Sequence, residues 1–276
     1  MIINNNIAAL NTHRQMGQVS GNAAGSMEKL SSGMRINRGA DDAAGLSISE
    51  KMRGQIRGLE QAAKNSQDAV SLIQTADGAL NESHAILQRM RELTVQGASD
   101  TNNTAERDAI AGELTQLTST IEDIASTTQF NGQKLLDGSA NGDTGLLTIQ
   151  SGANTGETLE LDLTNANLTT TIDALKLVDV STAAGAATAL TTLDTAIETV
   201  SSARAYTGAV QNRLDYTINN LNASAENTQA AESRIRDVDM AKEMMNLTKN
   251  NILTQASQAM LSQANQAPQA VLQLLR

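Results

Sequence analysis

The stretch NSQDAVSLIQTADGALNESHAILQRMRELTVQ, residues 65–96, decides the fold because apolar and small side chains recur in it at alternating steps of three and four. That spacing is typical of a helix that packs along a seam against other helices. The pattern extends back to Asp42, which predicts one helix of about 55 residues with Asp41 or Asp42 as its N-cap. The predicted seam residues are Ile48, Met52, Ile56, Leu59, Ala63, Ser66, Val70, Ile73, Ala76, Leu80, His84 and Leu87.

Four more helical segments follow from the same reasoning. A turn-like segment at 97–103 leads into a second helix, for which Asn103 and Glu106 have the spacing of a capping box. A third long helix is predicted from about 186 to 230, and weaker helical patterns occupy both ends of the chain. The N-terminal pattern ends at Gly33, which suits a left-handed C-cap.

The composition changes between the second and third helices. Asn-Gly and Asp-Gly pairs there are strong turn signals. LLTIQ (146–150) and TLELDL (158–163) have the pattern of short strands, the second alternating apolar and polar residues. We therefore predict a small β-rich insertion that is exposed at the surface and dispensable.

Together these patterns predict a mainly α protein. The expected fold is a long antiparallel coiled-coil helical bundle, with both termini forming a second helical hairpin, plus the small β-rich insertion. The predicted domains are an inner core helical domain of residues 1–40 with 238–276, a long-helix bundle domain of 41–137 with 186–237, and the insertion at 138–185.

Composition and charge exclude several functional classes. A net charge of −10 disfavours nucleic-acid binding, which needs a basic surface to neutralise phosphates. The chain has no Cys and two distant histidines, and it lacks the common metal and phosphate-binding motifs, so we expect no enzyme, no cofactor and no metal. No run approaches the ~20 apolar residues that span a bilayer, and the N-terminal residues do not have the pattern of a Sec signal peptide.

Four long segments carry a resemblance to bacterial flagellin, in a short form without large outer domains. The first two lie toward the N-terminus and the last two toward the C-terminus. They are KLSSGMRINRGADDAAGLSISEKMRGQIRGL (29–59), the stretch 65–96 quoted above, GAVQNRLDYTINNLNASAENTQAAESRIRDVDMAKEM (208–244) and NILTQASQAMLSQANQAPQAVLQLLR (251–276).

This resemblance implies a structural subunit that self-assembles into the extracellular flagellar filament for motility. It implies export of the unfolded chain through the flagellar type III apparatus and polymerisation at the filament tip. The implied partners are other copies of the chain, the flagellar cap and hook-associated proteins, an export chaperone at the C-terminal arm, and the vertebrate Toll-like flagellin receptor. A hook–filament junction protein is the nearest alternative, and periodicity alone allows a cytosolic coiled-coil scaffold.

The resemblance also implies two sets of site residues. Gln88, Arg89, Met90, Leu93 and Glu113 match the segments that the receptor recognises, and they serve subunit packing as well. The alternative for these residues is an ordinary solvated helix face. The residues expected in terminal assembly are Ile7, Leu10, Leu30, Val271, Leu272, Leu274 and Leu275.

Both terminal arms are expected to be disordered in the free subunit and to become helical on assembly. Gly17, Gly21 and Gly25 lie four residues apart in the N-terminal arm, which fits either close helix approach in the assembly or a weak, flexible helix. The methionines of the C-terminal arm fit either a chaperone contact or ordinary seam packing.

Overall fold

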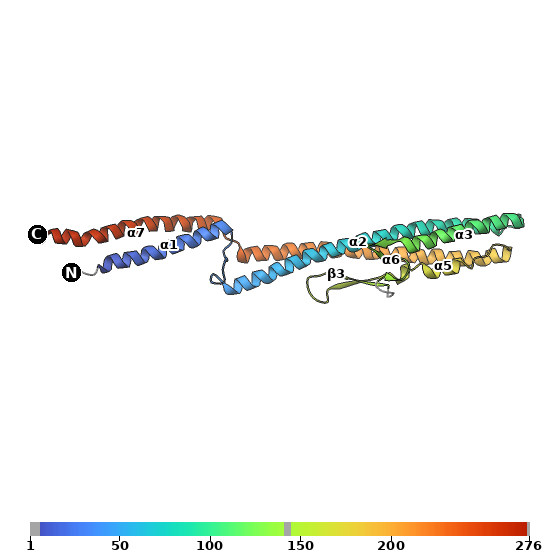
Figure 1. Cartoon of the computed structure of the whole chain (residues 1–276), viewed down its shortest axis with the longest axis horizontal. Coiled ribbons are helices and arrows are strands. Elements are labelled where there is room, and N and C mark those ends of the chain that lie inside the picture. Colours follow the sequence, from blue (N-terminus) through green and yellow to red (C-terminus); the bar gives the residue numbers. More distant parts are fainter. Residues whose placement is uncertain (1–5, 141–144, 275–276) are drawn as a thin grey trace. The chain divides into compact units, whose positions relative to one another are not determined.

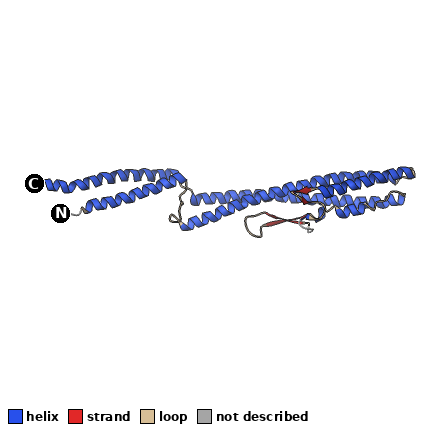
Figure 2. Cartoon of the chain, viewed as in Figure 1, coloured by secondary structure: helices blue, strands red, loops and turns tan. Residues whose placement is uncertain are grey.

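The structure is a computed structural model and describes residues 6–140 and 145–274. Helices dominate it, and the strands of the described residues form two small antiparallel pairs (Figures 1 and 2). This confirms the mainly α fold class. The chain divides into two compact units, one of residues 1–54 with 227–276 and one of residues 55–226.

The elements follow one another along the chain as long helices interrupted by short strands. They are α1 (Ile7–Ser32), α2 (Ala43–Gly97), α3 (Thr104–Thr127), β1 (Gln129–Phe130), β2 (Gln133–Lys134), β3 (Leu146–Gln150), β4 (Thr158–Asp162), the 3-10 helix η1 (Thr164–Ala166), α5 (Thr169–Leu175), α6 (Ala183–Arg236) and α7 (Met240–Leu274).

Local side-chain chemistry sets the helix ends. Asp42 caps α2, because its Oδ1 accepts a hydrogen bond of 2.8 Å from the main-chain N–H of Gly45. The predicted capping box of α3 is confirmed, since Asn103 and Glu106 each accept from the other's main-chain N–H. Gly33 ends α1 with φ of 70°, the left-handed conformation that glycine adopts at no steric cost.

The core of the unit 55–226 lies among α2, α3, α6 and the segment between α3 and α6. α2 and α6 are antiparallel, because Arg91 pairs with Asp194 at 2.7 Å and Asp77 pairs with Arg204 at 3.2 Å. The most deeply buried row of α2 repeats at steps of three and four, as predicted. Its members are Ala62, Ser66, Ala69, Ile73, Ala76, Leu80, Ser83, Leu87, Met90 and Thr94.

The predicted seam was one residue off at several positions. Ala69 and Ser83 are at most 2% exposed, whereas Val70 and His84, which we assigned to the seam, are only partly buried. Ile48, assigned to its start, is 48% exposed. Small side chains at buried positions let neighbouring helices approach closely, and choosing seam residues by size and hydrophobicity overlooks them.

The segment between α3 and α6 packs into the core, which corrects the expectation of a surface-exposed insertion. The two predicted strands are present as β3 and β4, which pair as an antiparallel hairpin with Leu147 opposite Leu161. Leu161 is 1% exposed, and the main-chain N–H of Asp162 donates a 3.0 Å hydrogen bond to Tyr206 Oη of α6. After the hairpin come η1 and α5, so only part of the insertion is β-structure.

In the other unit α1 and α7 lie side by side (Figure 1). Asn6 Nδ2 donates a 2.8 Å hydrogen bond to the carbonyl of Ala264, which places the two helices antiparallel. Ala23 and Ser26 are the buried residues of α1. Most of the surface of this helix pair is therefore left uncovered within the chain.

The start of α2 and the end of α6 are held together in the same unit by charge. Glu232 is 8% exposed, and its Oε1 lies 3.1 Å from Arg53 Nε, close enough for an ion pair but not aligned for a hydrogen bond. One turn further along α6, the buried guanidinium of Arg236 binds Glu50. In each pair one side chain is buried and the other is about half exposed, and both pairs join α2 to α6.

Candidate interaction surfaces

The exposed face of α2 near residue 90 carries a small ionic cluster. Arg89 donates from Nη1 to Glu92 at 3.1 Å and from Nη2 to Glu113 of α3 at 3.2 Å. The carboxylates of Glu92 and Glu113 raise the pKa of the Arg89 guanidinium above its ordinary value, chiefly through these hydrogen bonds. Gln88 lies next to the cluster, with its Nε2 2.9 Å from His84 Nε2. We call Gln88, Arg89, Glu92 and Glu113 the α2–α3 polar face.

Two of the predicted recognition residues do not belong to this face. Met90 is 0% exposed and Leu93 is 3% exposed, because both side chains point into the core between the helices. Their place in the helical repeat explains this, since Met90 continues the buried row three residues after Leu87. In this structure, only Gln88, Arg89 and Glu113 of the predicted set are available to a partner.

The terminal helices carry most of the large apolar side chains that are exposed among the described residues. In α1, Ile7 is 62% exposed and Leu10 is 74% exposed, while Leu30 is partly buried. The backbone of Val271, Leu272 and Leu274 is helical in α7, and Leu275 lies outside the described residues. Up to residue 266, where the description of the side chains ends, the large exposed apolar residues of α7 are Met240, Met244, Met245, Ile252, Leu253 and Met260.

A groove of about 500 Å³ runs along this exposed part of α7. The predicted assembly residues did not include Ile252 and Leu253, which line it together with Met244 and Met245. In the sequence, the apolar dipeptide Ile252-Leu253 follows the apolar dipeptide Met244-Met245 at a distance of eight residues. In a helix this spacing brings the two dipeptides to the same side, and this pattern could have identified them. We call these four residues the α7 apolar face.

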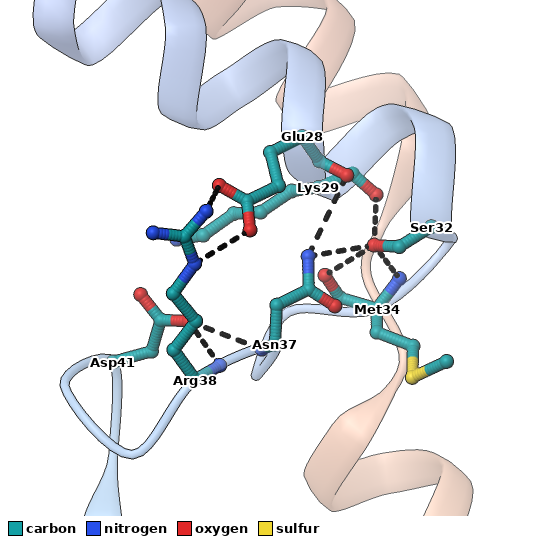
Figure 3. A network of polar contacts seen from close by, with 7 residues as sticks. All are labelled: Glu28, Lys29, Ser32, Met34, Asn37, Arg38 and Asp41. Carbon is teal, nitrogen blue, oxygen red and sulfur yellow. Dashed lines mark hydrogen bonds and ion pairs between the residues drawn. The ribbon is translucent and has the colours of Figure 1, made fainter.

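The connection between α1 and α2 forms a polar network that the sequence did not predict (Figure 3). Arg38 binds Glu28 through two hydrogen bonds of 2.9 and 3.0 Å, and Asn37 donates to Ser32 at 2.8 Å. Asp41 Oδ2 accepts the main-chain N–H groups of Arg38 and Asn37, which lower the pKa of this carboxyl. Asp41 thus ties the loop together, while Asp42 caps the helix.

Main-chain hydrogen bonds join this connection to the short link between α6 and α7. The N–H of Arg35 donates to the carbonyl of Arg236 at 2.6 Å, and the N–H of Val238 donates to that of Gly33 at 3.0 Å. Gly45 leaves room for the buried Ile36, since a Cβ at residue 45 would lie 2.8 Å from Ile36 Cδ1. We call residues 33–42 and 235–239 the joint.

Residues 6–140 and 145–274 contain no group of three or more metal-ligating side chains. In the same residues, no helix combines the length and the hydropathy needed to cross a bilayer. Long packed helices, terminal helices with exposed apolar faces and a hydrogen-bonded joint are the features of a helical structural protein.

The chain belongs to the bacterial flagellin family. Residues 3–141 match the bacterial flagellin N-terminal helical region, and residues 190–275 match the bacterial flagellin C-terminal helical region. The resemblance seen in the sequence is confirmed, including the short form. The protein is accordingly a structural subunit of an extracellular flagellar filament, in which it associates with other copies.

Individual relatives agree with this assignment. The chain is 59% identical over 276 residues to a flagellin of Halalkalibacterium halodurans, and 54% identical over 308 residues to a flagellin of Bacillus subtilis, each match covering 100% of both chains. It is similar in structure to Bacillus cereus flagellin, with 37% sequence identity, a TM-score of 0.51, and coverage of 61% of this chain and 94% of that one.

A flagellar hook-associated protein from Vibrio parahaemolyticus shares the fold alone. Its TM-score is 0.56 at 14% sequence identity, covering 72% of this chain and 98% of that chain. Helical architecture of this kind is therefore not specific to filament subunits.

Proposed function

We propose that the chain is exported unfolded, reaches the tip of the growing filament and polymerises there through α1 and α7. The observation that carries this proposal is the exposed apolar surface of the two terminal helices. Leu10 at 74% and Met245 at 66% are too exposed to stabilise the isolated unit. Burying such residues against other copies supplies free energy in proportion to the apolar area removed from water.

Export and delivery fit the composition of the chain. The absence of Cys means that no disulfide can obstruct threading of an unfolded chain. The α7 apolar face is the surface that an export chaperone would cover before assembly, and its methionines adapt to irregular partners. The flagellar cap and the hook-associated proteins are the further partners at the two ends of the filament.

Recognition by the vertebrate Toll-like flagellin receptor is assigned to the α2–α3 polar face. Arg89 presents a planar donor group that suits a carboxylate or carbonyl of a partner. Its side chain is 53% exposed, so a partner can reach it once Glu92 and Glu113 give way. In the filament the same face serves packing between subunits, so the receptor binds the free monomer.

The test of assembly is salt-induced polymerisation of the purified chain, followed by electron microscopy. Filaments are expected from the full chain, and none from a chain lacking residues 271–276. A substitution of exposed Thr115 by Ser, away from both terminal helices, is the matched control and should assemble normally. Short aggregates without helical order from the intact chain would contradict the proposal and favour a scaffold.

The hook–filament junction alternative is distinguished by location. A junction protein occurs in a short zone at the filament base, whereas a filament subunit is found along its whole length. Labelling of sheared filaments with an antibody against this chain separates the two outcomes.

A further inference from the structure

The tip of the β1–β2 hairpin is a turn of two residues, Asn131 and Gly132. The strand register pairs Phe130 with Gln133 and Gln129 with Lys134, so only these two residues connect the strands. Both have positive φ, 52° at Asn131 and 79° at Gly132. Such turns favour Asn-Gly because Asn tolerates the left-handed conformation and Gly adopts it freely.

We propose that Asn131 is a site of spontaneous deamidation in the folded protein. The main-chain nitrogen of Gly132 attacks Asn131 Cγ and loses its proton, the bond from Cγ to the side-chain nitrogen breaks, and ammonia leaves. The product is a five-membered succinimide. Water then opens the ring at either carbonyl, giving aspartate at one and isoaspartate at the other. No oxidant, reductant or enzyme is needed.

Three properties of the turn favour this reaction. Asn131 and Gly132 are both exposed, so water reaches the ring and ammonia departs freely. The side chain of Asn131 makes no hydrogen bond among the described residues, so its amide is free to rotate toward the backbone. No heavy atom lies within 4 Å of the position that a Cβ of Gly132 would take, so no neighbouring group covers that side of the turn.

Within residues 6–140 and 145–274, two Asp-Gly pairs that could form the same ring are protected by their surroundings. The carboxylate of Asp137, before Gly138, accepts hydrogen bonds from Ser139 and pairs with Lys134. Burial raises the pKa of Asp137, but these bonds outweigh it and lower the pKa, so the group stays ionised and resists attack. Asp77, before Gly78, lies within α2, where the helix fixes the backbone and Arg204 binds the side chain.

The isoaspartate product would disturb the core next to the hairpin. It places one extra carbon in the main chain, which a two-residue turn cannot absorb without shifting the strand register. Phe130 packs against the core, and Leu135 and Leu136, directly after β2, are 1% and 0% exposed. A structure outside the cell that persists without replacement of its subunits would accumulate this change with age.

The experiment incubates the folded full-length chain at mildly alkaline pH and follows the peptide containing residue 131 by mass spectrometry with isoaspartate detection. A synthetic peptide of residues 127–137, incubated in parallel, gives the rate without the hairpin. We expect the folded chain to convert more slowly than the peptide, because the turn must open first, but to yield both acids. A folded chain that keeps the Asn131 amide in full after many half-lives of the peptide reaction overturns the proposal.

Two variants separate the effect of the new negative charge from the effect of the extra main-chain carbon. Asn131→Gly keeps a turn-compatible residue without the amide, and it should show no loss of thermal stability on ageing. Freshly purified Asn131→Asp carries the new charge without the extra main-chain carbon, and before ageing it should match the stability of the fresh wild-type chain. Equal loss of stability on ageing in the wild type and in Asn131→Gly would contradict the proposed role of this site.

Discussion

Arg89 of α2 and Glu113 of α3 are joined by a hydrogen-bonded ion pair of 3.2 Å across the two helices. Their side chains are 53% and 48% exposed, so water and salt screen the pair. Exposed pairs of this kind contribute little to folding. The effect of the pair is instead to orient the Arg89 guanidinium, which Glu92 also holds. Stability and recognition at this face can therefore be measured independently.

We expect Arg89→Ala to weaken binding of the free monomer to the Toll-like flagellin receptor by about thirtyfold or more, the loss typical of an arginine at the centre of an interface. Direct titration measures this, and thermal unfolding should be nearly unchanged. Arg204→Ala is the control, since it removes another ion-paired arginine, bound to Asp77, from a different part of the bundle. Equal affinities of wild type and Arg89→Ala would refute the assignment.

A second prediction concerns the packing of the buried row of α2. Ala76 is 0% exposed, whereas Ala85 is exposed on the same helix. Ala76→Leu should overpack the seam and cost about 1–3 kcal/mol in the free energy of unfolding. Ala85→Leu adds the same atoms in solvent and should change it by no more than about 0.5 kcal/mol. Denaturant titration of the two variants compares them, and similar values would show that the seam is misplaced.

Local rules predicted the helix ends well, because a cap depends on a few neighbouring residues. Asn103 with Glu106 and Gly33 are found where the sequence placed them. The seam of α2 was predicted in its period but not in its phase, since Ala69 and Ser83 give weaker signals than the larger residues beside them. Which of two adjacent residues faces the core depends on partner helices distant in the sequence.

The candidate sites, too, depend on contacts between residues that are distant in the sequence. A match of sequence segments grouped Met90 and Leu93 with Arg89, although the helix turns the first two inward and the third outward. The joint could not be predicted at all, because it depends on hydrogen bonds between Gly33 and Val238 and between Arg35 and Arg236. Only the folded chain brings those residues together.

The β3–β4 hairpin supplies a third prediction, on the role of the central segment. Leu161 is 1% exposed and Leu146, on the partner strand, is 42% exposed. Leu161→Ala should lower the free energy of unfolding by about 2–5 kcal/mol, as expected for a leucine buried in a core. Leu146→Ala should have a much smaller effect. If Leu161→Ala is as stable as the control, the hairpin is the dispensable surface element that the sequence suggested.

The pairing of α1 and α7 should depend on pH through Glu243. The hydroxyl of Ser26 hydrogen-bonds to this carboxylate, Asn246 donates to it and Lys29 lies nearby, and together they lower the pKa of Glu243 below its ordinary value of 4.5. The folded state therefore favours the ionised form. Its contribution to stability is present above pH 4.5 and is lost as the pH falls through the lowered pKa.

Glu243→Gln removes this titration. Hydrogen exchange of the amides in α1, measured on the polymer above and below that pH, should show less loss of protection on acidification in the variant than in the wild type. Glu198→Gln, in an exposed part of α6, is the control and should behave as wild type. The same acid response in all three chains would rule out Glu243 as its source.

The terminal helices are expected to be unstable in the free subunit and to hold their structure only in the filament. Fixing each backbone residue costs about 1–2 kcal/mol, and single helices in water are marginal even with favourable sequences. Against this cost α1 buries only Ala23 and Ser26 among its residues, while Ile7 and Leu10 remain exposed. Its three glycines, Gly17, Gly21 and Gly25, each weaken the helix by about 1 kcal/mol relative to Ala.

Those glycines have no heavy atom within 4 Å of a would-be Cβ, so α7 does not use the space that they leave. Another copy of the chain can approach α1 closely there, and the α7 apolar face is likewise uncovered. We therefore expect folding of the arms to be coupled to association. Hydrogen exchange on the free monomer should then show little protection in α1 and in residues 245–270 of α7, and strong protection in α2 and α3. In the polymer, the same amides of α1 and α7 should become protected. Strong protection of α1 in the free subunit would mean that the helix pair is stable alone, and the arms would then dock as preformed helices.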